Sequence, residues 1–110
     1  MITRYAIFTG QIREGQETAF RNYVDTRLTP LWRKFDGASQ LRVMFGQDQD
    51  ATGPQIPLIL AIEYPDRAAM ARALDSPARY ESRDLLPELY EKYLDATLHH
   101  YVMETECYRD

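Results

Sequence analysis

The 110-residue sequence has one cysteine, few glycines and no long apolar run. Cys107 alone cannot form an intramolecular disulfide, which favours a reducing compartment, and we expect a cytoplasmic protein. The five glycines are dispersed, so no phosphate-binding loop or dinucleotide-binding motif is formed. The longest aliphatic run, residues 58–62, is far too short to span a bilayer. Paired-cysteine metal spacings are also missing, so no metal is predicted.

Basic residues are also fewer than acidic residues. Thirteen lysine and arginine residues face seventeen aspartate and glutamate residues, which gives a net charge of −4. A surface of this sign repels phosphate backbones, and nucleic acid is therefore excluded as a partner. Hydrophobic residues nevertheless make up 45% of the chain, enough for a folded core. The length predicts a single domain over residues 1–110.

The hydrophobic periodicity changes several times along the chain. Period-two patterns predict strands over residues 2–12 and 41–46, the continuously apolar segment 57–64 predicts a third strand, and a last strand is expected over 98–107. Three- and four-residue spacings predict a helix over 17–35, a short helix over 66–74 and a longer one over 77–94. Pro30 should interrupt the first helix, with Thr29 capping a restarted turn.

This order of elements is strand, helix, strand, strand, helix, strand. It predicts an α+β fold with a four-stranded antiparallel sheet and helices on one face. The strand at 57–64 is apolar on both faces, and Met44 with Val102 or Met103 adds apolar area to the uncovered face. Because an exposed apolar sheet face drives association, we expect a homodimer formed through that face.

Two stretches resemble the dimeric α/β-barrel superfamily, which has a ferredoxin-like βαββαβ fold. Residues 27–37 (RLTPLWRKFDG) are similar to the end of the first helix in ethyl tert-butyl ether degradation (EthD-like) proteins. Thr29 stands where that family commonly has a histidine, and Asp36 where it commonly has a proline. Residues 63–70, Ser76-Pro77 and 85–87 resemble the second half of antibiotic-biosynthesis monooxygenase-like domains. The resemblance implies a dimeric α/β barrel.

Adjacent histidines begin the last predicted strand. Neighbouring strand residues point to opposite faces, so His99 and His100 cannot chelate one metal together. One of them should face a cavity, where an imidazole serves as a general base because its ordinary pKa lies near neutrality. A histidine bound only to backbone or water is the alternative.

Aromatic and charged residues supply further candidates for the site. Tyr5, Trp32, Tyr64 and Tyr101 are predicted to line an aromatic pocket, with core packing as the alternative for Trp32. Arg42 is a candidate for binding a substrate carboxylate or phenolate, or for a cross-strand ion pair with Glu63.

Three functions are consistent with the superfamily and these residues. The first is a cofactor-independent monooxygenase, cyclase or EthD-like catabolic enzyme that acts on a small hydrophobic or aromatic compound. The second is a non-catalytic ligand-binding or accessory protein of a catabolic operon. The third is a haem-binding protein that uses one histidine, and no cofactor is implied in the other two cases.

Overall fold

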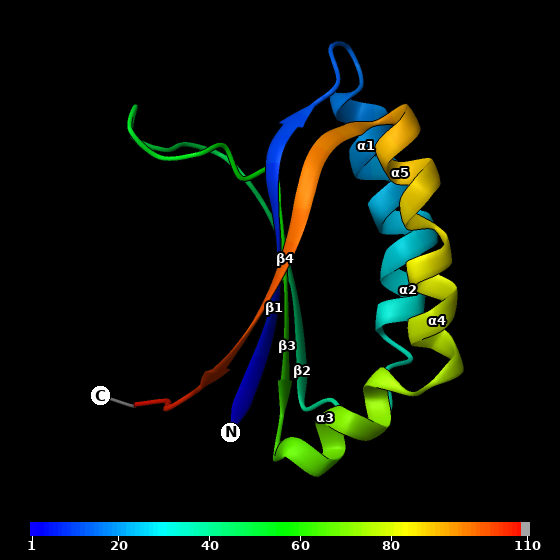
Figure 1. Ribbon diagram of the computed structural model, residues 1–110, viewed down its shortest axis with the longest axis vertical. Helices are drawn as coiled ribbons and strands as arrows, with labels where there is room; N and C mark the ends of the chain where they lie inside the picture. The colour runs from blue at the N-terminus through cyan, green and yellow to red at the C-terminus, as the bar shows by residue number, and fades with distance from the viewer. Residues whose placement is uncertain (109–110) are drawn as a thin grey trace.

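The computed structural model describes residues 1–108 and contains one antiparallel sheet. Its strands are β1 (Ile2–Ile12), β2 (Gln40–Phe45), β3 (Leu58–Tyr64) and β4 (Leu94–Glu104), in the spatial order β2-β3-β1-β4. Figure 1 views the sheet almost edge-on, with the helices on one side only. The predicted α+β fold, with its order of strands and helices and its one-sided helical layer, is confirmed.

The helical layer is formed by two regions of the chain. The first consists of α1 (Glu17–Tyr23), the π-helical turn η1 (Val24–Leu28) and α2 (Thr29–Trp32). The second consists of α3 (Arg67–Leu74), α4 (Pro77–Asp84) and α5 (Leu86–Lys92).

Strand register assigns each side chain to one of two faces. Phe8 lies opposite Leu58 on β3 and Leu98 on β4, and its ring centroid is 6.4 Å from that of Tyr90 on α5. Because side chains alternate along a strand, even-numbered residues of β1 and their partners form the helix face. The odd-numbered residues and their partners form the open face. The open face includes Tyr5, Ile7, Arg42, Met44, Ile59, Ala61, Glu63, His99, Tyr101 and Met103.

The interruption of the first helix near Pro30 is confirmed, and it takes the form of a π-helical turn. Proline has no N–H to donate to the Thr26 carbonyl, four residues earlier in the chain. The Thr29 N–H instead donates to the Val24 carbonyl, five residues earlier. The predicted capping role of Thr29 is wrong, because this residue lies inside α2 and its buried hydroxyl has no partner among the described residues.

The second helical region is more broken than predicted. Asp66 caps α3, and its Oδ1 accepts a hydrogen bond of 2.8 Å from the Ala69 N–H. The predicted continuous helix over 77–94 is wrong, since it divides at Leu85, two residues before Pro87 in the first turn of α5. The last strand begins at Leu94 rather than at residue 98, because α5 ends early enough for the chain to join β1 there.

Two segments extend beyond the sheet on the side away from the helices. Residues 46–57 form an arm between β2 and β3, and the chain that follows β4 leaves on the same side (Figure 1). Backbone hydrogen bonds hold the base of the arm, from Gly46 to Pro57 and from Gly10 to Gln55. Across residues 1–108, no helix has both the length and the apolar character needed to cross a bilayer.

Candidate functional site

The sheet separates the predicted site residues into two groups. The open face carries Tyr5, Arg42, His99 and Tyr101, whereas Tyr64 and His100 lie on the helix face and Trp32 is buried in the helical layer. The two histidines point to opposite faces, as predicted. A single aromatic pocket formed by Tyr5, Trp32, Tyr64 and Tyr101 is wrong, since the thickness of the sheet lies between its members.

The predicted ion pair between Arg42 and Glu63 is also wrong. Arg42 lies opposite Ala61, two residues before Glu63, so the two charged residues are diagonal neighbours on the open face. Such a diagonal pair is within reach of long side chains only when both lean toward each other. The one ion pair within residues 1–108 joins Lys92 to Glu88 at 2.8 Å.

A cationic residue lies on the helix face near the start of β1. Arg4 lies between Ile62 on β3 and Val102 on β4, and Tyr64 and His100 are its diagonal neighbours. Partial burial, followed by the nearby Arg79 guanidinium of α4, lowers the pKa of Arg4. An arginine is still charged under these conditions, so the fold places a cation beside apolar neighbours.

Tyr64 supplies an unused hydrogen-bond donor next to this cation. Its side chain is fully buried, and its hydroxyl has no hydrogen-bond partner among the described residues. Burial raises the pKa of Tyr64 to about 12, although the charge of Arg4 acts in the opposite direction. The phenol is therefore protonated at neutral pH. A buried hydroxyl without a partner costs about 1–3 kcal/mol, so this group is an unusual feature of the core.

His100 lies where the helical layer stops covering β4. Along the helix face of this strand Leu94 is buried, Ala96 and Leu98 are half-buried, and His100 and Val102 are exposed. Figure 1 shows the corresponding departure of β4 from the helices toward its end. Desolvation, with the positive charges of Arg4 and Arg79, lowers the pKa of His100 to about 4. Although the residue as a whole is exposed, its imidazole is thus neutral near pH 7.

Together Arg4, Tyr64, Arg79 and His100 define what we call the helix-face cluster. Arg4 and Arg79 were missed by the sequence analysis. The signal for Arg4 is its even register with Ala6 and Phe8, which places a charged residue on the face that carries the core. Arg79 gives a weaker signal, since its only mark is a position between the buried Ala78 and Ser82 of α4.

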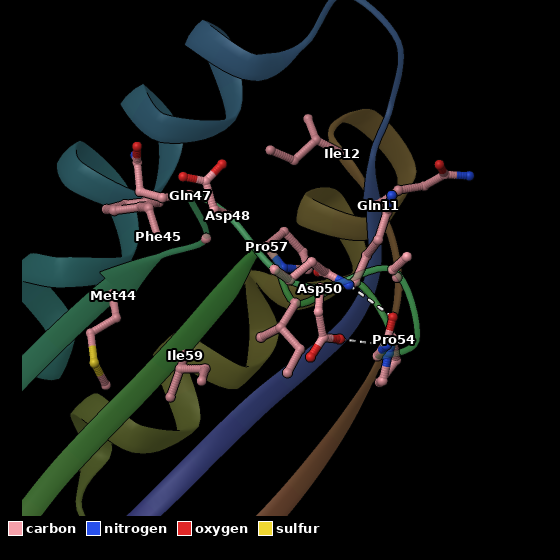
Figure 2. A pocket seen from close by; sticks show the side chains of 17 residues that line it. Gln11, Ile12, Met44, Phe45, Gln47, Asp48, Asp50, Pro54, Pro57 and Ile59 are labelled. Carbon is pink, nitrogen blue, oxygen red and sulfur yellow. Dashed lines mark hydrogen bonds between the residues drawn. The ribbon is translucent and has the colours of Figure 1, made fainter.

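Two hollows lie elsewhere on the surface. The larger, of about 740 Å³, is an open hollow between the arm and the ends of β1, β2 and β3. Figure 2 shows its lining, which includes Gln11, Met44, Asp50, Pro57 and Ile59. The second, of about 480 Å³, lies between the turn after α2 and the start of α4. Neither hollow is lined by a predicted site residue or by the helix-face cluster.

Metal binding receives no support from the described part of the chain. Residues 1–108 contain no group of three or more histidine, cysteine, aspartate or glutamate side chains arranged to hold an ion. Cys107 is exposed and free of any disulfide within this range.

Comparison with known proteins places the chain in a structural class. No family model matches the sequence, and no curated protein matches it. Among solved structures, an ethyl tert-butyl ether degradation family protein from Bacillus halodurans has a TM-score of 0.74 at 16% identity, over 96% of this chain and 100% of that one. SnoaB, a cofactor-independent oxygenase from Streptomyces nogalater, has a TM-score of 0.62 at 19% identity, over 97% and 94%.

A third solved structure is that of a dimeric protein. A dimeric protein of unknown function with a ferredoxin-like fold, from Bacteroides fragilis, has a TM-score of 0.64 at 11% identity, over 94% of this chain and 96% of that one. At such identities the likeness establishes the fold alone. The chain has the ferredoxin-like fold shared by EthD-like and monooxygenase-like proteins, as the resemblance in its sequence implied.

Proposed function

We propose that this protein is a cytoplasmic homodimeric enzyme of the cofactor-independent monooxygenase, cyclase or EthD-like kind, acting on a small hydrophobic or aromatic compound. The observation that carries the proposal is the helix-face cluster. It combines a neutral imidazole, two guanidinium groups and an unpaired phenol on the helix face, beside the uncovered end of β4. A buried donor without a partner in the folded chain needs an explanation, and a bound ligand supplies one for Tyr64.

In this proposal each group has a distinct role. The neutral imidazole of His100 accepts a proton from the bound compound, and the resulting negative charge lies near Arg4 and Arg79. In an oxygenase of this kind the deprotonated compound itself reduces dioxygen. One oxygen atom enters the product and the other leaves as water, together with two hydrogens from the substrate. No electron donor beyond the substrate is required.

The dimer is proposed to form through the open face. A row of side chains runs across all four strands there, from Met44 through Ile59 and Ile7 to His99. Tyr101 and Met103 leave about half of their surfaces exposed, at 51% and 52%. The arm and the segment after β4 flank this face, where each would lie against a second copy (Figure 1). His99, Tyr5 and Arg42 would then be interface residues.

The two adjacent histidines provide a matched test of the catalytic role. Oxygen uptake and product formation are measured with a panel of hydroxylated aromatic compounds for the wild type, His100→Ala and His99→Ala. The proposal predicts that His100→Ala loses at least a hundredfold in turnover, while binding of the compound and the activity of His99→Ala are largely retained.

Other outcomes separate the competing functions. Binding of a compound without turnover by the wild type would favour a ligand-binding or accessory protein. A shifted Soret band on titration with haem, removed by either histidine substitution, would favour haem binding. Equal turnover by all three proteins would exclude His100 as the base.

A further inference from the structure

The helix-face cluster contains an unbalanced set of charges. Within residues 1–108, Arg4 forms no ion pair and no side-chain hydrogen bond. Arg79 donates only to the Leu74 carbonyl, at 3.3 Å, and its guanidinium lies 5.5 Å from the ring centroid of Tyr80. Glu104 shares the helix face with Arg4 but is exposed and forms no ion pair with it. Two guanidinium groups whose charges interact therefore have no carboxylate partner among residues 1–108.

The Tyr64 hydroxyl, like the two guanidinium groups, is suited to an anionic ligand. The Tyr64 hydroxyl is fully buried, protonated and without a partner among the described residues, so it can donate a hydrogen bond. The fork of a guanidinium group matches the two oxygens of a carboxylate, or the single oxygen of a phenolate, through charge-assisted hydrogen bonds. Each of these three side chains is suited to the same kind of ligand atom, a negatively charged oxygen.

The neighbours of Arg4 define the rest of the ligand. Ile62 is buried on one side of Arg4, and Val102, which is 40% exposed, flanks it on the other side at the uncovered part of β4. An apolar body attached to the anionic group would cover Val102 and remain accessible from the edge of the sheet. A small inorganic anion would leave this apolar surface in water.

We propose that the helix-face cluster binds an organic anion, with a carboxylate or phenolate oxygen held by Arg4, Arg79 and Tyr64 and an apolar or aromatic body against Val102. This inference rests on the proposed function in placing the ligand on the helix face, and it specifies the charge of that ligand. The bound oxygen lies beside His100, and its negative charge raises the pKa of the imidazole toward neutrality, where a general base is most effective.

A pair of probes of nearly equal shape tests the charge requirement. Binding of 1-naphthoate and of neutral 1-naphthamide to the intact protein is measured by calorimetry, with benzoate, salicylate and inorganic phosphate as further probes. We expect 1-naphthoate to bind at least tenfold more tightly than 1-naphthamide and than phosphate. The His100 imidazole resonances should also titrate at a higher pH when 1-naphthoate is bound.

Variants identify the residues that hold the anion. Arg79→Gln and Arg4→Gln should each weaken 1-naphthoate binding at least tenfold, and Tyr64→Phe should weaken it severalfold. Arg83→Gln is the matched control, because Arg83 is an exposed residue of α4 whose guanidinium lies over Tyr80, at 5.0 Å. Arg79→Gln alters a helix side chain outside the core, so it keeps the test decisive if Arg4→Gln does not fold.

Several results would overturn the inference. Equal binding of 1-naphthamide and 1-naphthoate would do so, while leaving a small-molecule function on the helix face intact. Equally tight binding of phosphate would replace the organic anion by a general anion site. Failure of all three aromatic carboxylates to bind, or binding that Arg79→Gln and Arg83→Gln affect equally, would also contradict the inference. Catalysis that fails while the carboxylate still binds would count against the proposed enzyme only.

Discussion

Substitution of Tyr101 by glutamate should dissociate the proposed dimer. Tyr101 is 51% exposed on the open face, next to Tyr5 across the strand pair. A tyrosine offers about 200 Å² of surface, so about 100 Å² remains to be buried in each copy. Two-fold symmetry doubles this area, and at about 25 cal/mol per Å² the side chain contributes up to about 5 kcal/mol to association. That free energy corresponds to up to about three and a half orders of magnitude in Kd.

The adjacent residue provides the control for this experiment. Val102 is 40% exposed on the same strand but points to the helix face. Sedimentation equilibrium over a wide range of concentrations should show Tyr101→Glu as a monomer where the wild type is a dimer, with Kd raised at least a hundredfold. Val102→Glu should remain a dimer.

A wild type that is monomeric at all concentrations would contradict the proposed dimer. Dissociation of the dimer by Val102→Glu but not by Tyr101→Glu would contradict an open-face interface, because the interface would then lie on the edge or helix side of β4. Circular dichroism of both variants shows whether each remains folded.

Three further predictions concern the helix-face cluster and the backbone of β1. The pKa of His100, measured by NMR titration, should be about 4 and should rise in Arg79→Gln; a value near 6.5 would remove the argument for a desolvated, neutral imidazole. Because this folded pKa lies below the unfolded value, the stability that the neutral His100 contributes is present above about pH 6.5 and is lost as the pH falls toward 4. Tyr64→Phe should leave the free energy of unfolding unchanged or raise it by about 1 kcal/mol, because the substitution removes an unpaired buried hydroxyl. Urea denaturation measures this free energy, and a decrease of several kcal/mol would show that the hydroxyl has a hydrogen-bond partner after all. Gly10→Ala should lower the free energy of unfolding by more than about 2 kcal/mol, because φ is +149° and the added Cβ would lie 2.1 Å from the Asp95 carbonyl oxygen. Gly15→Ala is the control. Its φ is +78° with open space around it, so the free energy of unfolding should fall by only about 1 kcal/mol.

The sequence was sufficient to predict the arrangement of strands and helices. Period-two patterns such as Leu41, Val43 and Phe45 identified the faces of β2, and Pro30 marked the place where the first helix departs from α geometry. The end of the second helix was misplaced because Tyr93 and Leu94 continue its apolar spacing. Only pairing of Leu94 with Ile12 on β1, a long-range contact, makes it the first residue of β4.

The candidate site was less accessible to sequence reasoning. The alternation of His99 and His100 followed from strand geometry, but the face that carries a ligand site depends on where the helical layer ends. That boundary lies between Leu98 and His100, and it depends on how far the helical layer extends along β4 rather than on any local pattern. The unpaired state of Tyr64 depends likewise on what the folded chain places around it.

A crystal structure of the protein with 1-naphthoate would test most directly whether the ligand site lies on the helix face of the sheet. We expect a homodimer joined by its open faces, with the carboxylate near Arg4, Arg79 and Tyr64 and the naphthalene ring against Val102 in each copy. A ligand between the two sheets beside Tyr5 and Arg42, or in the hollow beneath the arm, would contradict it.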